Sequence, residues 1–67
     1  MEEYDYEYYQ DRADLWRWRI IHKNGEIVDA STEGFGSVQS CLRNVSSVAR
    51  AFGVPDFDTS VFKKTDY

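Results

Sequence analysis

Aromatic or aliphatic residues alternate with charged residues in two stretches near the N-terminus, and a period of two is typical of a half-buried β-strand. The first stretch, residues 3–10, alternates tyrosines with acids: Glu3, Tyr4, Asp5, Tyr6, Glu7 and Tyr8. The second, residues 15–23, alternates apolar with basic side chains: Trp16, Arg17, Trp18, Arg19 and Ile20. We expect two strands with aromatic side chains in the core and charged ones in water, joined by a polar connector over residues 11–14.

The dipeptide Asn24-Gly25 indicates a hairpin turn, which makes residues 26–31 a third strand and residues 15–31 a β-hairpin. Two registers are open. A two-residue loop sets Ile20 opposite Asp29 and Trp18 opposite Ser31.

A three-residue loop over residues 23–25, with Gly25 in a left-handed bulge, shifts the pairing by one residue. It sets Ile20 opposite Val28 and Trp18 opposite Ala30, and it pairs Arg19 with Asp29 on the other face. We prefer this register because only it gives one consistently apolar face.

Residues 37–52 are predicted to form a helix, with Ser37 as its N-cap. Its apolar positions recur at helical spacing and make one stripe: Val38, Cys41, Leu42, Val45, Val48, Ala49 and Phe52. Gly53 ends the helix and Pro55 blocks its continuation. Before the helix, residues 32–36 form a loop in which Gly34 and Gly36 supply unusual backbone angles.

The C-terminal segment, residues 53–67, has a weaker pattern. Residues 57–62 are a candidate for a short fourth strand, and residues 63–67 are expected to be a loose tail. The whole chain, residues 1–67, is then one two-layer α+β domain with three antiparallel strands, one helix across a face and a short C-terminal strand. The other face of the sheet holds Leu15, Ile21, Ile27 and Tyr9 among charges, as a dimer or partner surface would.

The composition limits both stability and chemistry. A chain of 67 residues buries a small core, although two tryptophans, five tyrosines and four phenylalanines help to fill it. Cys41 is the single cysteine, which excludes an internal disulfide, and with His22 it supplies too few ligands for structural zinc. We therefore expect no metal and no cofactor. A lone thiol, an acidic start unlike a signal peptide and the lack of a long apolar run favour the cytoplasm.

Neither catalysis nor nucleic-acid binding is favoured by the residue pattern. We interpret His22 as a rim histidine beside the turn, with Glu26 opposite, and Cys41 as a buried core thiol. The tryptophans and arginines of residues 16–19 alternate, so they belong on opposite faces and not on one stacking platform. We expect a non-enzymatic protein without direct contact to nucleic acid or membrane.

The order of several motifs resembles the YegP-like domains of unknown function. The motifs that carry the resemblance, between residues 6 and 50, are Tyr6-Glu7-Tyr8-Tyr9 with Asp11, Trp16-Arg17-Trp18-Arg19, Asn24-Gly25-Glu26-Ile27, Ser31 with Glu33-Gly34-Phe35, Ser37, and Val45 with Ser47-Val48. The resemblance implies a three-stranded sheet with a packed helix, in tandem repeats or in single domains that associate. It implies no activity and no functional residues. The acidic tyrosine-rich start and residues 52–67 depart from the family pattern.

The net charge of −4 is concentrated near the N-terminus, where residues 1–14 hold six acids and one base. Acids at alternate strand positions recur about every 6.6 Å on one face, on the scale of the phosphate spacing in nucleic acid. Our first hypothesis is an inhibitor or nucleic-acid-mimicking decoy, similar to anti-CRISPR proteins, that docks on a basic surface of a nucleic-acid-handling complex. Its candidate partner-binding residues are Glu2, Glu3, Asp5, Glu7, Asp11 and Asp14, with Tyr4, Tyr9 or Tyr67 as anchors.

Two other interpretations stay open. The acids can simply form a solvated strand face that keeps the edge from aggregating. The second functional hypothesis is a homodimer built on the outer face of the sheet, with an unspecified housekeeping role.

Overall fold

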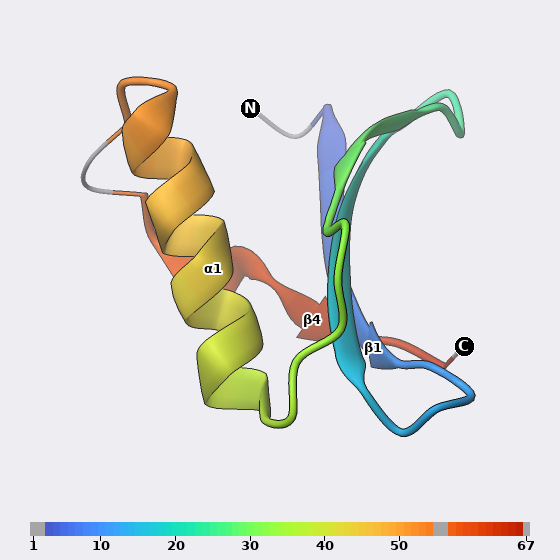
Figure 1. The fold of residues 1–67 in the computed structure, drawn as a ribbon. Helices are drawn as coiled ribbons and strands as arrows, with labels where there is room; N and C mark the ends of the chain where they lie inside the picture. The colour runs from blue at the N-terminus through green and yellow to red at the C-terminus, as the bar shows by residue number, and fades with distance from the viewer. Residues whose placement is uncertain (1–2, 55–56, 67) are drawn as a thin grey trace.

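The computed structural model describes residues 3–54 and 57–66, which form a sheet with a helix on one face (Figure 1). The elements in chain order are β1 (Tyr4–Gln10), β2 (Trp16–His22), β3 (Ile27–Ala30), α1 (Val38–Ala51), the 3₁₀ turn η1 (Thr59–Val61) and β4 (Lys63–Lys64). The sheet order is β3-β2-β1-β4; β1, β2 and β3 are antiparallel, and β4 is parallel to β1. The predicted two-layer α+β class with a short C-terminal strand is confirmed.

Both hairpins of the sheet use a three-residue loop. At the β1–β2 loop, Asp11 N donates to Leu15 O at 2.8 Å, and Asp14 takes a positive φ of 63°. At the β2–β3 loop, His22 N donates to the Glu26 carbonyl at 2.8 Å, and Gly25 has φ 94°. A left-handed third loop residue allows a tight turn to rejoin a twisted strand. The predicted left-handed Gly25 is confirmed.

The predicted register of β2 and β3 is right at the turn and wrong beyond it. Ile21 pairs with Ile27, as the three-residue loop requires, but Ile20 pairs with Asp29, so that Val28 is an extra, bulged residue. Past the bulge, Ser31 N donates to Trp18 O at 2.9 Å, and Arg19 lies opposite Ala30. The predicted pairs of Ile20 with Val28, Trp18 with Ala30 and Arg19 with Asp29 are therefore wrong, because a β-bulge changes the register within the strand.

Helix α1 begins and ends as predicted. The Ser37 hydroxyl accepts a hydrogen bond from Ser40 N at 3.1 Å, which caps the first turn. At the other end, Gly53 has φ 88°, Gly53 N donates to Arg50 O and Val54 N donates to Ala49 O. These are the two bonds of a Schellman cap. The predicted role of Pro55 lies outside the described residues.

The C-terminal end of the predicted apolar stripe is not in the core. Cys41 and Val45 are buried, and Leu42 and Val48 pack against them, but Phe52 is 78% exposed. Figure 1 shows that the C-terminal end of α1 leans away from the sheet, so the stripe loses its partner surface there. Helical spacing alone could not indicate this tilt.

The core centres on Trp18, which is 2% exposed and is buried together with Cys41, Val45 and Phe62. Its indole Nε1 donates to Asn44 Oδ1 at 2.8 Å, so the buried N–H has a partner on α1. Its ring meets Phe62 edge-on at 6.4 Å. Strand β2, helix α1 and the C-terminal segment therefore meet at one side chain.

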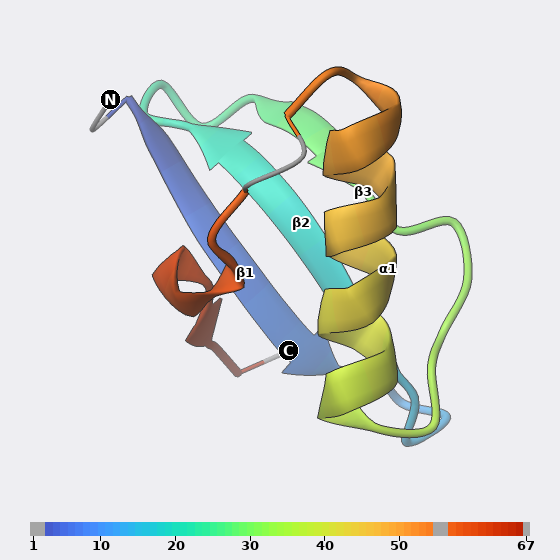
Figure 2. The same ribbon diagram turned by 90° about the vertical axis from the view of Figure 1, so that its left-hand side faces the viewer.

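The C-terminal segment differs from its prediction. Residues 57–62 do not form a strand: the Asp58 side chain accepts from Ser60 N at 3.0 Å and begins η1 instead. Such local side-chain bonds compete with sheet pairing. The fourth strand is Lys63–Lys64, within the expected loose tail, and Thr65 N donates to Tyr8 O at 2.9 Å. Figure 2 shows η1 and β4 beside β1.

Glycines 34 and 36 do not have the unusual backbone angles predicted for them, since the described glycines with positive φ are Gly25 and Gly53. Gly34 is required for space. A Cβ there would lie 2.5 Å from Leu15 Cβ, where β2 and the loop meet through the paired bridge of Trp16 and Phe35.

We expect Gly34→Ala to destabilise the protein by about 1–3 kcal/mol, because backbone must shift to relieve the overlap with Leu15. The free energy of unfolding in urea measures the change. Gly36→Ala is the matched control, because a Cβ at Gly36 has nothing within 4 Å. Equal stability of the two variants would contradict the steric role of Gly34.

Candidate interaction surface

The outer face of the sheet, opposite α1, carries the charged residues that the sequence predicted to be exposed. Strand residues directly opposite each other share a face. In the β1–β2 register Glu7 pairs with Arg19, Asp5 with Ile21 and Tyr9 with Arg17. In Figure 1 the sheet lies almost edge-on, with α1 on one side and no helix or strand on the other. This outer face therefore has no second layer in the described part of the chain.

Three acids of this face lie in a row on or just beyond β1, and each of the three has a cation from β2 or its turn beside it. Lys23 Nζ lies 3.7 Å from Asp5, Arg19 Nε lies 2.9 Å from Glu7, and Arg17 Nε lies 2.6 Å from Asp11. We call these three pairs the ion-pair ladder. Three acids of the predicted row, Asp5, Glu7 and Asp11, therefore each lie next to a base, whereas no ion pair is found for Glu3 or Asp14 among the described residues.

The three pairs differ in exposure. The Asp5 and Lys23 side chains are 56% and 58% exposed, whereas those of Glu7 and Asp11 are 22% and 12% exposed. Exposed pairs contribute little to stability because water screens them and the side chains lose entropy on pairing. The two arginine pairs are the more ordered part of the ladder.

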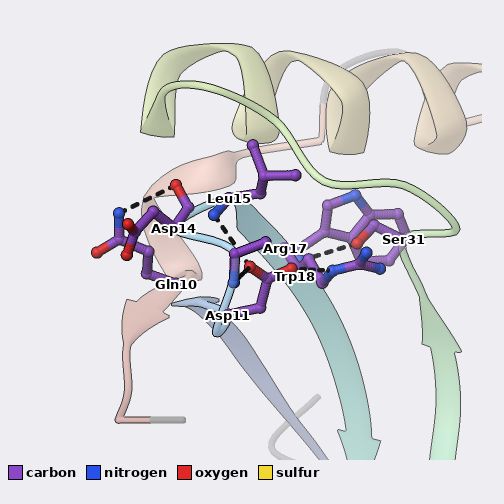
Figure 3. Close-up of polar contacts among 8 residues, drawn as sticks. Gln10, Asp11, Asp14, Leu15, Arg17, Trp18 and Ser31 are labelled. Atoms are coloured by element: carbon purple, nitrogen blue, oxygen red, sulfur yellow. Dashed lines mark hydrogen bonds and ion pairs between the residues drawn. The ribbon is translucent and has the colours of Figure 1, made fainter.

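Asp11 organises the β1–β2 loop as well as holding Arg17 (Figure 3). Its Oδ1 accepts from Ala13 N at 2.8 Å and from Leu15 N at 3.0 Å, while its Oδ2 accepts from Arg17 Nε. The hydrogen bond from Arg17, followed by that from Leu15, lowers the pKa of the Asp11 carboxyl from its usual 3.8. These intramolecular bonds explain why an acid stands at this position, and no binding to another protein is needed to explain it.

Aromatic and aliphatic side chains border the ion-pair ladder. The Arg19 guanidinium lies 4.8 Å from the centre of the Tyr9 ring, a cation–π contact. Beside β2, Ile27 pairs with the partly buried Ile21 and is 58% exposed, and the bulged Val28 is 55% exposed. The outer face thus combines a charged centre with an apolar border on β3.

The other predicted site residues are dispersed. Glu3 is exposed, and its carbonyl accepts from Lys23 N at 2.8 Å. Asp14 is exposed in the loop, where its carbonyl accepts from the Gln10 side chain at 3.2 Å. Tyr4 meets the His22 ring edge-on at 5.4 Å, on the helix side of the sheet. Glu2 and Tyr67 lie outside the described residues.

The residue pattern alone did not predict Arg17, Arg19 and Lys23 as partners of the acids. A signal was present, because charged residues alternate in both strands and a short connector makes the strands antiparallel neighbours. Only the register decides which base meets which acid, and Arg19 was assigned to Asp29 where the structure pairs it with Glu7.

His22 and Cys41 have local roles. His22 Nδ1 accepts from Asn24 N at 3.2 Å inside the β2–β3 turn. Cys41 is fully buried, and burial raises the pKa of its thiol to about 11. A thiol of this kind is almost entirely protonated at neutral pH and is a poor nucleophile.

Within residues 3–54 and 57–66, no three His, Cys, Asp or Glu side chains come together as a metal site would require. No described helix has both the length and the apolar character needed to span a bilayer.

Comparisons with known proteins agree with the resemblance noted in the sequence. Residues 11–52, more than half of the chain, match the family described as Domain of unknown function (DUF1508), which confirms the YegP-like resemblance. The chain is similar to a protein from Haloferax volcanii with a solution NMR structure, at 40% identity and a TM-score of 0.70. That match covers 87% of this chain and 93% of the other. The comparison with curated proteins found no match.

We expect Asp11→Asn to lower stability near neutral pH and to have a smaller effect in acid. Because the pKa of Asp11 is lowered in the folded protein, its ionised form stabilises the fold above about pH 4, and this contribution is lost as pH falls through the lower folded-state value. Thermal midpoints of wild type and variant across acidic and neutral pH measure the difference. Asp14→Asn, in the same loop, is the control, because the hydrogen bond found for Asp14 uses its backbone carbonyl, which the substitution keeps.

Proposed function

Because this chain belongs to the DUF1508 family, whose function is unknown, we propose that it is a non-enzymatic protein-interaction module. We propose further that a protein partner binds the outer face of the sheet. The observation that carries the proposal is the open outer face, on which arginines and a tyrosine are held in ordered positions.

The residue types of the outer face support this proposal. Arginine and tyrosine are enriched among the residues that dominate binding energy at protein interfaces. Here Arg17 and Arg19 are held by the acids of the ion-pair ladder, and Arg19 lies on Tyr9. Side chains ordered before binding lose less entropy on binding, which favours affinity. Ile27 and Val28 add exposed apolar surface at the border.

A non-enzymatic role is supported by the state of the two reactive side chains. The Cys41 thiol is buried with a raised pKa, and His22 accepts a backbone hydrogen bond in a turn. Two surface hollows, of about 330 and 380 Å³, border β1 and the β1–β2 loop, and Asp5, Glu7 and Asp11 in their walls are paired with cations. A catalytic site would place an acid or base against a substrate pocket.

The finer proposal concerns a partner with a basic surface, as in a nucleic-acid-handling complex. Such a partner must replace the cations that already neutralise the acids of β1. Asp5 is the acid best suited to this exchange, since its pair with Lys23 is long at 3.7 Å and more than half exposed. Glu7 and Asp11 are tied to arginines, so the nucleic-acid-decoy version has less support than binding of a protein with mixed charge.

A second candidate is self-association through the same face. Acids follow β1 and bases follow β2, so the outer face presents two parallel rows of opposite charge. A twofold axis brings the same patch of two copies together and can set the acid row of each against the base row of the other. This arrangement favours a second copy as the partner if no other protein binds.

We expect Ile27→Glu to weaken partner capture about tenfold or more, because it puts a carboxylate into the apolar border of the interface. The bait is the wild-type chain in a nuclease-treated lysate of the source organism, with the affinity of the captured protein then measured by interferometry. The double variant Asp5→Lys/Glu7→Lys tests whether the captured partner binds through a basic surface. Val54→Glu, a change at an exposed residue beyond α1, is the matched control.

Circular dichroism must first show that the variants fold. Binding that Ile27→Glu leaves unchanged would contradict the outer-face proposal. Light scattering after size exclusion tests the second candidate: a dimer that Ile27→Glu separates supports self-association, whereas a monomer at high micromolar concentration rejects it.

A further inference from the structure

Strand β3 places an acid on the helix side of the sheet. Asp29 pairs with Ile20, whose side chain packs against the core, so the carboxylate lies on the inner face and is partly buried. Its Oδ1 accepts from Ala30 N at 2.9 Å. Among the described residues, no Lys, Arg or His nitrogen lies within 4.0 Å of the Asp29 carboxylate. The three acids of the ion-pair ladder, by contrast, all have cations.

Asp29 lines a groove of about 230 Å³ between β3 and the C-terminal half of α1. The residues around the groove are Trp18, Asp29, Ala30, Ser31, Thr32, Asn44, Val48 and Phe52. Trp18 and Asn44 are joined by their side-chain hydrogen bond, which ties β2 to α1 at the groove. Asp29 is the charged residue of this set.

Phe52 makes the helix wall of the groove apolar. It is 78% exposed, although helical spacing aligns it with the core stripe, because α1 leans away from the sheet at this end (Figure 1). With Val48 it offers a hydrophobic surface across the groove from the Asp29 carboxylate.

We propose that this groove binds an extended segment of a partner protein in which a lysine or arginine stands next to an aliphatic or aromatic residue. The cation pairs with Asp29 and its apolar neighbour packs on Val48 and Phe52. Charge supports this choice: residues 24–36, which include β3, contain Glu26, Asp29 and Glu33 and no lysine or arginine. A basic segment therefore meets attraction along the whole β3 side.

The dimensions favour a peptide side chain over a cofactor. Pockets for drug-sized molecules enclose about 300–1,000 Å³, more than this groove holds. Addition of a full strand to the β3 edge is less favoured, since Asp29 already accepts the Ala30 N–H that such a strand would use. Side-chain contacts should therefore dominate recognition.

This groove lies on the helix side of the sheet and is independent of the proposed outer-face interface. The probe is a library of random peptides displayed on phage, selected on the immobilised wild-type chain and depleted on Asp29→Asn. We expect the enriched peptides to carry a basic residue beside an apolar one. Asp29→Asn should weaken a synthetic enriched peptide about tenfold, the size expected for loss of a charge-assisted hydrogen bond. Phe52→Ala should have a similar effect.

The controls lie outside the groove: Asp14→Asn removes an acid of the β1–β2 loop and Val54→Ala removes an exposed apolar side chain, and neither should change affinity more than about twofold. In a proton–nitrogen NMR spectrum, the peptide should shift the indole N–H of Trp18 and leave that of Trp16 in place. Lack of enrichment, enriched peptides without a basic residue, or equal binding to Asp29→Asn would overturn the proposal. The proposal would also be overturned if the chain self-associates and Phe52→Ala abolishes this self-association. Ile27→Glu changes only the outer face, so it should leave peptide binding to the groove intact. Failure of the groove proposal can therefore be distinguished from failure of the proposed function.

Discussion

The whole fold depends on the burial of Trp18 between the sheet and α1. Strand β2 lies between β1 and β3, and Trp18 is the residue of β2 that is buried in the core. Its ring contacts Phe62, and its N–H is bonded to Asn44. Among the described residues, four hydrophobic side chains form the buried core, so a single large side chain carries much of the apolar burial. A chain this small has little else with which to fix the helix on the sheet.

The bulge at Val28 decides what each face of the sheet presents. Before it, Ile27 lies on the outer face with Ile21; after it, Asp29 lies on the inner face with Ile20. Without the extra residue, an apolar side chain would have stood where the acid now lines the groove. Bulges often re-aim side chains in this way, and they concentrate near functional sites. Both surfaces proposed for binding thus border the same irregularity.

The distribution of charge in space differs from its distribution along the chain. Residues 1–14 carry all of the excess negative charge, yet Asp5, Glu7 and Asp11 are neutralised by bases of β2 and its turn. On the inner face, Asp29 has no such partner among the described residues, although the sequence pattern had paired it with Arg19. A count of charges in a segment is therefore a poor guide to the potential a partner meets.

The sequence by itself determined the features that arise from neighbouring residues. Alternation identified β1 and β2, Asn24-Gly25 identified the turn, and Ser37 and Gly53 marked the ends of α1, because turn and cap chemistry acts over a few residues. The family resemblance also rested on such local motifs.

Only the tertiary structure decided the bulge at Val28, the partner of Arg19, the exposure of Phe52 and the position of β4. Each of these depends on how elements distant in sequence pack, on the tilt of α1 or on the register of the sheet. Periodicity carries no information about either of them. The predicted acidic row was found where expected, but the cations beside it, which decide what that row can bind, were fixed by packing between strands.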